Sequence, residues 1–366
     1  MKVDINPKIL TWAREERGMS AEDVAGKLKF DVSDLRQWEL DGKDIHFGSL
    51  ESVAKLYKRQ TAVFFLPEVP AKVRKPKDCR NLAVNGGSFS PETMLAVRRT
   101  ERYLQVARDL SGTLYWNGQY EWIKNFTGKE ANLEKEINLL KEFLEINDVG
   151  NSSRRSDVAF RDWRTKIEEK LGIFVFQFPM QENELDGFSY AFEEFPYAIV
   201  INNQNPPVRK IFTLFHELGH MLKHNPGACK TDYSTESNQL AIELECNNFA
   251  GKFLVPAEHL KATTSVDEIF ELAGRLNISG EVYLRRLSEE QKISKSKFFE
   301  ILELVRERSN SFKKKKEKGA PSMIIQSKST RGNKFFNSVT TGATNGKMSY
   351  SAASDLLGLK VGNIRL

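Results

Sequence analysis

The sequence predicts a multidomain, mainly α-helical protein that contains a small β-sheet. The chain has 366 residues and 40% hydrophobic content, which is more than one compact core usually holds, so we expect two or three domains. Most segments place apolar residues at three- and four-residue intervals, the pattern of amphipathic helices. Runs of β-branched and aromatic residues are confined to residues 173–178 and 197–201, which predicts only a few strands.

Composition excludes several classes of protein. The longest apolar runs, such as residues 62–66, are far too short to span a bilayer, and residues 1–10 lack the apolar core of a signal peptide. Three widely spaced cysteines fit a reducing compartment and provide neither a disulfide framework nor a thiolate metal cluster. We therefore expect a cytoplasmic protein with no membrane partner.

Shifts in composition predict where the domains end. Segments rich in Pro, Gly or charge read as linkers. The run Lys313–Lys316 is interpreted as a solvated linker, with a contribution to nucleic-acid contact left open, because the net charge of +6 is modest. The expected parts are a helical domain at 1–66, a linker at 67–90, a helical region at 91–154, an α+β domain at 155–308, a basic linker at 309–322 and a small C-terminal helical module at 323–366.

Within the α+β domain, a helix at 158–172 precedes the two strands, and residues 187–195 form a third strand or a turn between them. Two further helices are expected at about 207–224 and 237–254. Asn205 is a good N-cap for the first of these helices, and the Pro-Gly pair at 226–227 stops it.

The first of these two helices carries the pattern H-E-x-x-H. His216 and His220 are four residues apart, so their imidazoles lie on one helical face at the spacing that a tetrahedral Zn²⁺ requires from two nitrogens. Glu217 sits one position on, where it can reach a metal-bound water and act as general base instead of ligating the metal. Apolar neighbours would bury the pattern, which strengthens the prediction of a catalytic zinc site.

A catalytic zinc also needs a third protein ligand. We expect Glu243, which lies on the next helix with Asn247 four residues later on the same face. Asn247 would hold the free N–H of a ligating histidine. Two alternatives stay open: His224, which has drifted around the helix from His216, and Glu245, which points about 200° away from Glu243 on the helical wheel.

These residues resemble the ImmA/IrrE metallopeptidases, which have a minimal, thermolysin-like gluzincin core. The matching text is RKIFTLFHELGHMLKH followed by ELECNNFAGKFLVP, and DGFSYAFEEFPYAIVINNQ is similar to the strand segment ahead of that family's active-site helix. The resemblance spans roughly residues 155–290. It implies zinc bound by His216, His220 and Glu243, with Glu217 as the base. Cys246 departs from the family's usual Ala, and a reduced Cys is small and apolar enough to replace it.

The resemblance implies peptide hydrolysis. Glu217 would take a proton from the attacking water and pass it to the leaving nitrogen. The side chain that stabilises the oxyanion is not identified by the pattern; Tyr190, Tyr197 and His259 are candidates, and packing or surface roles are the alternative for each.

Residues 9–58 resemble a Cro/repressor-type helix-turn-helix of the Xre class. Gly18 ends a first helix, Ser20 caps a second, and a recognition helix follows that ends near Gly42. In that class, the start of the recognition helix meets base edges in the major groove. The resemblance therefore implies DNA contacts by Ser33, Arg36 and Gln37. However, residues 1–66 contain eleven basic and eleven acidic residues, so strong non-specific attraction to phosphates is not expected.

Two functions follow. The first is a cytoplasmic zinc endopeptidase with a DNA-binding head, whose substrate would be a transcriptional repressor or regulator in stress response or mobile-element control. The alternative is a DNA-binding regulator, or an antitoxin of a toxin–antitoxin pair, in which the zinc is structural or rarely used. A catalytic zinc keeps an open fourth position, which favours the enzyme. A homodimer is compatible with both.

Overall fold

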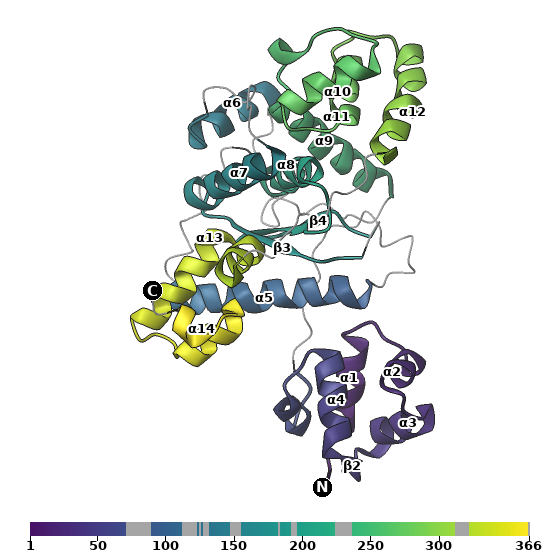
Figure 1. Ribbon diagram of the computed structural model, residues 1–366, viewed down its shortest axis with the longest axis vertical. Coiled ribbons are helices and arrows are strands. Elements are labelled where there is room, and N and C mark those ends of the chain that lie inside the picture. The colour runs from purple at the N-terminus through teal and green to yellow at the C-terminus, as the bar shows by residue number, and fades with distance from the viewer. Residues whose placement is uncertain are drawn as a thin grey trace. The chain divides into compact units, whose positions relative to one another are not determined.

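The computed structural model describes most of the chain (Figure 1). The described residues are 1–70, 89–111, 123, 126, 132–146, 155–181, 184–191, 196–223, 236–311 and 322–364. They are mostly helical, with two small sheets, in agreement with the predicted fold class. They form two compact units. Unit 1 contains the described residues of Met1–Lys75, Asn81–Glu101 and Pro179–Glu184, and unit 2 contains those of Arg102–Phe178 and Leu185–Leu366.

Unit 1 begins with a bundle of short helices. Its elements are β1 (Lys2–Val3), α1 (Pro7–Glu15), α2 (Ala21–Leu28), α3 (Val32–Asp41), β2 (Ile45–His46), α4 (Phe47–Tyr57) and the 3₁₀ helix η1 (Thr61–Phe65). β1 and β2 pair in antiparallel fashion. One apolar core joins the helices, and it includes Ile9, Leu10, Leu35, Val53 and Phe64. The next helix, α5, spans Pro91–Ser111.

The turns of this bundle follow the sequence signals. Ser20 and Asp23 form a reciprocal capping box at the start of α2, which satisfies two backbone N–H groups. Gly42 ends α3 in the left-handed conformation, with φ of 69°. A Cβ at Gly42 would lie 2.3 Å from the carbonyl oxygen of Ile5, so both the conformation and the close approach require glycine. The predicted cap at Ser20 and the predicted end near Gly42 are confirmed.

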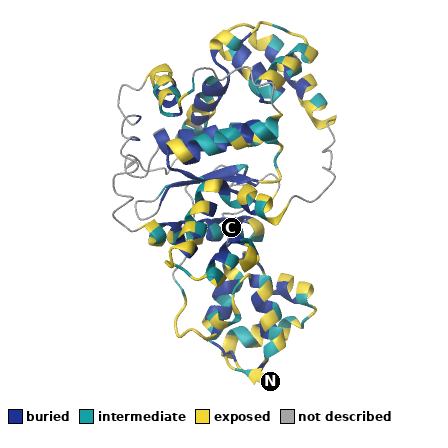
Figure 2. Cartoon of the chain, turned by 60° about the vertical axis from the view of Figure 1, so that its left-hand side comes forward, coloured by how far each residue is buried: buried dark blue, intermediate teal, exposed yellow. Residues whose placement is uncertain are grey.

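Unit 2 is built on a three-stranded sheet. Its strands are β3 (Phe174–Phe178), β4 (Gly187–Tyr190) and β5 (Ala198–Asn202). β5 is central, with β3 parallel and β4 antiparallel to it. All residues of β3 and β5 are buried, as Figure 2 shows, because helices cover both faces. Figure 1 shows α7 (Ser156–Lys170) and α8 (Pro207–Lys223) on one side of the sheet and α13 (Met323–Thr344) on the other.

The other elements of unit 2 are helical. They are α6 (Leu133–Phe143), α9 (Glu236–Leu254), the 3₁₀ helix η4 (Ala257–His259), α10 (Val266–Arg275), α11 (Gly280–Glu289), α12 (Lys295–Ser311), α14 (Tyr350–Leu357) and the 3₁₀ helix η5 (Val361–Asn363). Among the described helices, none combines the length and the apolar character needed to cross a membrane.

Helices α8 and α9 pack directly on each other through aromatic side chains. Phe215 of α8 stacks on Phe253 of α9 with 4.3 Å between the ring centroids, and Trp163 of α7 meets the edge of Phe215 at 5.0 Å. Gly219 lets the two helices approach closely, since a Cβ there would lie only 3.1 Å from Cδ1 of Phe249 on α9. This close packing fixes which residues of α9 face the His-bearing side of α8.

A buried ion pair within α7, between Arg164 and Glu168, also bonds to the backbone of the broken helix α13. Gly332 interrupts α13 with φ of 79° and ψ of 157°, and the backbone N–H groups of Asn333 and Lys334 donate to the carboxylate of Glu168. Arg164, one turn before Glu168, donates to the carbonyl oxygens of Ser329 and Val175. Burial raises the pKa of Glu168, which Arg164 and the N–H donors oppose. The C-terminal helices are therefore held to the sheet by polar contacts that are not apparent in the sequence.

Most predicted elements of unit 2 are close to the observed ones. The strands expected at 173–178 and 197–201 are β3 and β5, and β4 covers the first part of the strand or turn at 187–195, of which residues 192–195 lie outside the described part. The N-cap predicted at Asn205 is wrong. Helix α8 begins at Pro207, one residue too late for that cap, and the side-chain amide of Asn205 donates to Asp186.

Candidate metal centre

Helix α8 presents the histidines because its opposite face is apolar. Ile211, Leu214, Phe215, Leu218 and Leu222 are buried in the core of unit 2. His216 and His220, four residues apart, then lie one turn from each other on the side that faces α9. His216 is 1% exposed, and its ring centroid is 4.8 Å from that of His220.

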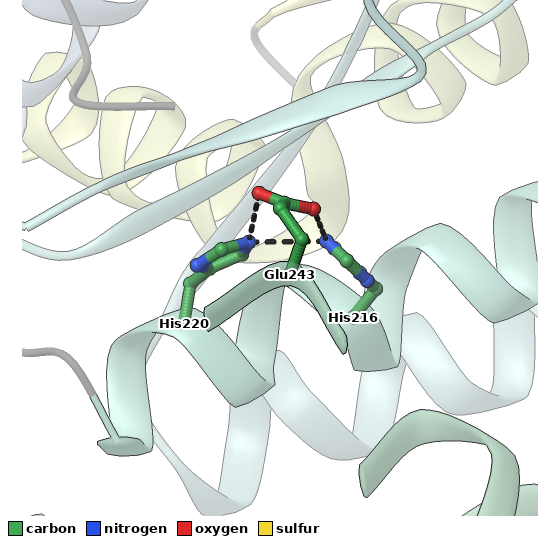
Figure 3. Close-up of side chains that lie close together, drawn as sticks. All are labelled: His216, His220 and Glu243. Carbon is green, nitrogen blue, oxygen red and sulfur yellow. Dashed lines mark hydrogen bonds and ion pairs between the residues drawn. The ribbon is translucent and has the colours of Figure 1, made fainter. Parts of the chain in front are cut away.

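The carboxylate of Glu243 completes the cluster from α9. Its two oxygens lie 3.2 Å from Nε2 of His216 and 3.2 Å from Nε2 of His220, and the two imidazole nitrogens are 3.0 Å apart. Figure 3 shows the carboxylate above both rings, with all three groups directed at one point. Two nitrogens and one carboxylate, which turns a different oxygen to each nitrogen, therefore form a small triangle at the contact between the two helices.

These distances fit a bound divalent cation. Ligands about 2.0–2.1 Å from a tetrahedral zinc ion lie about 3.3 Å from one another. The two nitrogens are 3.0 Å apart, and each lies 3.2 Å from one of the two carboxylate oxygens, which is close to that edge length. The three residues are thus a triad that could bind a metal ion, and two imidazoles with one carboxylate form a donor set that zinc takes in catalytic sites.

A neighbouring amide orients the first histidine. Nδ1 of His216 lies 2.9 Å from Oδ1 of Asn247, one helical turn after Glu243. Because the amide oxygen only accepts hydrogen bonds, Nδ1 carries the proton, and the lone pair of His216 is left on Nε2, toward the other two ligands. Asn247 stands where the sequence predicted a partner for a ligating histidine.

The surroundings of the second histidine, His220, raise its pKa. Burial lowers the pKa of His220, but hydrogen bonds with Cys246 and Glu243, together with the negative charge of Glu217, outweigh it and raise the pKa from 6.5 to about 11. Two hydrogen-bonding groups and one further negative charge therefore act on this imidazole. A cation at the triad would take the place of the proton and satisfy the same groups.

Glu217 lies between helix α8 and strand β4. It is fully buried, and a Cβ added to Gly187 of β4 would lie 3.5 Å from its Cγ. The same Cβ would lie 2.6 Å from the carbonyl oxygen of Val200 and 2.7 Å from a methyl group of Thr213. Gly187 therefore allows β4 to run against the part of α8 that carries Glu217. Sequence reasoning missed Gly187; a glycine inside a strand was the available signal for a close backbone approach.

The alternatives for the third ligand are placed differently. Glu245 is exposed on α9 and is not part of the triad, whereas Glu243 is. His224 lies outside the described residues. Among the oxyanion candidates, Tyr190 and Tyr197 are buried, and His259 is half-buried in η4. Any role of these three in chemistry stays a prediction.

The three residues predicted to contact DNA lie on α3 of unit 1. The hydroxyl of Ser33 donates to Asp31 over 2.8 Å, and the amide of Gln37 donates to Asp41 over 2.7 Å. The guanidinium of Arg36 pairs with Glu22 of α2, and both side chains are mostly exposed. Each predicted donor is thus on the surface but is already bonded to an acid of the same bundle.

The fold and the triad define the class of site: a helix pair that could bind a metal ion, beside a small sheet, with a buried glutamate next to the first histidine. Residues 168–288 match the model of a peptidase family, peptidase M78, described as the IrrE N-terminal-like domain. The match covers about a third of the chain and includes Glu217 and all three residues of the triad. The central part of the chain is therefore similar to a peptidase family.

Matches to whole proteins are weaker than the match to the family. No curated protein matches the chain. A solved structure described as a Mycobacterium tuberculosis transcriptional regulator is 17% identical, with a TM-score of 0.31, over 46% of this chain and 51% of that chain. The match thus spans about half the length of that protein.

Proposed function

We propose that unit 2 is a zinc-dependent endopeptidase in which His216, His220 and Glu243 hold the metal and Glu217 is the general base. The observation that carries the proposal is the triangle of two imidazole nitrogens and a carboxylate at 3.0 to 3.2 Å. The similarity of residues 168–288 to a peptidase family supports the same function independently.

The residues of the chain divide the chemistry among them. When bound, zinc supplies a Lewis acid that lowers the pKa of water and polarises a carbonyl. Glu217 accepts a proton from the attacking water and passes it to the leaving nitrogen, a transfer that requires a carboxylate at this position. Asn247 keeps the proton of His216 on Nδ1, so that Nε2 stays directed at the other ligands.

Partial exposure of the triad favours an enzyme over a structural metal site. The side chains of His220 and Glu243 are 13% and 17% exposed, whereas that of His216 is 1% exposed. Structural zinc sites are normally closed by four protein ligands, while catalytic sites keep one position for water or substrate. Among the described residues, three ligands with one accessible side match the second arrangement. This observation weighs against the alternative of a regulator or antitoxin whose zinc is structural.

The test is to replace Glu217 by Gln, which keeps the shape of the side chain and removes the base. Zinc-loaded full-length protein is incubated with a proteome-derived peptide library, and new termini are identified by mass spectrometry. We expect cleavage by the natural sequence and a loss of about 10²- to 10⁴-fold in the E217Q variant, with unchanged zinc content by elemental analysis. Glu245→Gln is the matched control on α9. Equal cleavage by E217Q would refute the proposal.

We further propose that unit 1 carries a helix-turn-helix head that recognises DNA through Ser33, Arg36 and Gln37 at the exposed start of α3. Support comes from the capped pair of helices α2 and α3 and from the suitability of arginine and glutamine as donors to guanine and adenine. Asp31, Asp41 and Glu22 would have to release these donors first.

On this proposal the substrate is a transcriptional repressor or regulator in the cytoplasm. The head would bring the peptidase to the repressor at the operator that the repressor occupies. A homodimer would match an operator with two-fold symmetry. Selection of bound sequences from a random DNA pool tests the head. Enrichment of one motif that is lost in the R36A variant is the expected result, and no enrichment contradicts it.

A further inference from the structure

Unit 1 contains three arginines that are largely buried and close together. Arg17 follows α1, Arg59 follows α4, and Arg98 lies on α5. Arg17 and Arg98 are only 6% and 7% exposed, and Arg59 is half-buried. Arginine is rarely buried to this extent unless its guanidinium is paired with an anion.

The printed contacts use only part of the donors of these guanidinium groups. Arg17 donates to the carbonyl oxygen of Pro91, and Arg98 donates to that of Tyr57 over 3.3 Å. The guanidinium carbon of Arg59 lies 4.4 Å from the ring centroid of Trp12. This cation–π contact uses the face of the guanidinium and does not use the N–H donors at its edge. Of the nitrogens of these three guanidinium groups, Nε of Arg17, Nε and Nη2 of Arg59, and Nη1 of Arg98 are buried and have no acceptor among the described residues.

The charges nearby do not balance. Glu16 is the acid that acts electrostatically on both Arg59 and Arg98, and its buried Oε2 has no donor. Glu92 attracts Arg17 from an exposed position, and Arg99 adds further positive charge. Burial, followed by repulsion from Arg59 and Arg17, lowers the pKa of Arg98 to about 9. The three guanidinium groups therefore repel one another in a poorly solvated place, and the carboxylates of Glu16 and Glu92 do not neutralise them and Arg99.

We propose that Arg17, Arg59 and Arg98 form a binding site for a small phosphate dianion. Together with Arg99, the three guanidinium groups make four positive charges against the two carboxylates of Glu16 and Glu92, which leaves two positive charges that a dianion would neutralise. Phosphate offers several oxygens that match the planar donor forks of arginine, so it could accept from the four nitrogens that have no partner. The site draws its residues from α5 and from the chain segments after α1 and α4, so a bound phosphate would tie these three parts of unit 1 together. It is separate from the metal triad and does not depend on peptidase activity.

Titration calorimetry of the full-length chain with inorganic phosphate, at constant ionic strength, tests the site. We expect saturable binding of one phosphate. Arg98→Gln and Arg59→Gln should each weaken binding by about tenfold or more, since each removes a charged donor. Lys55→Gln, an exposed charge on α4 of the same unit, is the matched control and should bind as the natural sequence does. The proposal would be overturned if phosphate does not bind saturably, or if the two arginine variants bind phosphate as tightly as the natural sequence does.

Glu16→Gln gives a test that does not depend on the stability of an arginine variant. Removing the carboxylate leaves the guanidinium groups without their internal counter-charge, so phosphate should bind about tenfold more tightly. If phosphate instead binds more weakly, Glu16 organises the arginines by itself and the proposal is wrong. A second titration, with adenosine 5′-monophosphate, separates two sources of the ligand. Binding equal to that of inorganic phosphate indicates a phosphate monoester, and binding of inorganic phosphate alone indicates the free ion.

Discussion

The metal triad of unit 2 and the exposed face of α3 in unit 1 are both short clusters of polar side chains, but their partners differ. In the triad, two imidazole nitrogens and a carboxylate converge on one point, at 3.0 to 3.2 Å. On α3, each of Ser33, Arg36 and Gln37 is instead bonded to a different acidic side chain. These are Asp31 at the N-cap of α3, Glu22 of α2 and Asp41 of α3, respectively.

The difference shows how a ligand site can be separated from a solvated surface. Acceptors that face one another repel unless a proton or a cation lies between them, so the protein maintains such an arrangement only where the fold imposes it. Donors and acids that pair locally cost little on a surface and carry no such demand. The triad requires a proton or a cation between its acceptors, whereas the donors of α3 must break existing hydrogen bonds before they can bind another molecule.

The largest effect should follow from Glu243→Ala. Losing one of three ligands leaves two imidazoles facing each other, and zinc affinity should fall by more than about 100-fold, beyond the usual cost of losing an outer-shell partner. Competition with a fluorescent chelator measures the affinity. Glu245→Ala, two residues along the same helix, is the control and should bind zinc normally. The comparison fails if the two variants lose zinc equally.

The next largest effect is expected on stability, at the buried carboxylate of Glu168, which already has its hydrogen-bond partners. At Gly332, an added Cβ would collide with Oε1 of Glu168 and lie 2.9 Å from the carbonyl oxygen of Val175, in a backbone conformation that strongly favours glycine. Gly332→Ala should therefore lower the free energy of unfolding by about 3 kcal/mol.

Chemical denaturation measures this loss. Gly346 is the matched control, since it shares a positive φ, of 70°, but a Cβ there would meet nothing within 4 Å. Gly346→Ala should cost only about 1 kcal/mol. Similar losses in both variants would mean that the contact with Glu168 contributes nothing.

Zinc binding should depend on pH through His220. Because the pKa of His220 is raised from 6.5 to about 11, the proton on this imidazole competes with the metal at neutral pH. Zinc affinity should rise by about tenfold per pH unit for this one proton as the pH increases above neutrality. Chelator competition at pH 7, 8 and 9 measures it, and an affinity that does not change with pH would contradict the assignment.

Metal-free protein should show the opposite dependence. A folded pKa above the unfolded value of 6.5 means that His220 contributes stability that is fully present below pH 6.5 and is lost as the pH rises toward 11. Denaturation midpoints of the metal-free chain at pH 6 and pH 9 provide this measurement. A His220→Asn variant, which does not titrate in this range, is the control and should lose that part of the dependence.

The smallest effect is expected on the surface of α3. Glu22→Ala releases Arg36 from its acid, and because both side chains are exposed, the free energy of unfolding should not change measurably. If the head reads a base through Arg36, the freed guanidinium no longer has to leave its ion pair, so the affinity for the selected motif should rise by about twofold to fivefold. Fluorescence anisotropy with that motif provides the readout. An unchanged affinity would mean that Arg36 does not face the DNA.

Elements and site differ in how far they could be predicted. The strands at 173–178 and 197–201, the cap at Ser20 and the end of α3 at Gly42 follow from side-chain periodicity and backbone conformation, which act over a few residues. The cap at Asn205 was wrong by one position: α8 begins at Pro207, and the carbonyl oxygen of Pro206 accepts from the first N–H groups of the helix. The pairing of Glu168 with the break in α13 joins residues more than 160 positions apart, and no local rule could predict it.

By itself, the sequence determined that two histidines and a glutamate lie on a buried helix, because a spacing of four residues places side chains on one face of any α-helix. It left three candidates for the third ligand. The tertiary structure brings Glu243 to the histidines, because Gly219 and the stacked pair of Phe215 and Phe253 set how α8 and α9 dock. Periodicity within one helix is a property of the backbone. The register between two helices depends on how their side chains pack, and that exists only in the folded molecule.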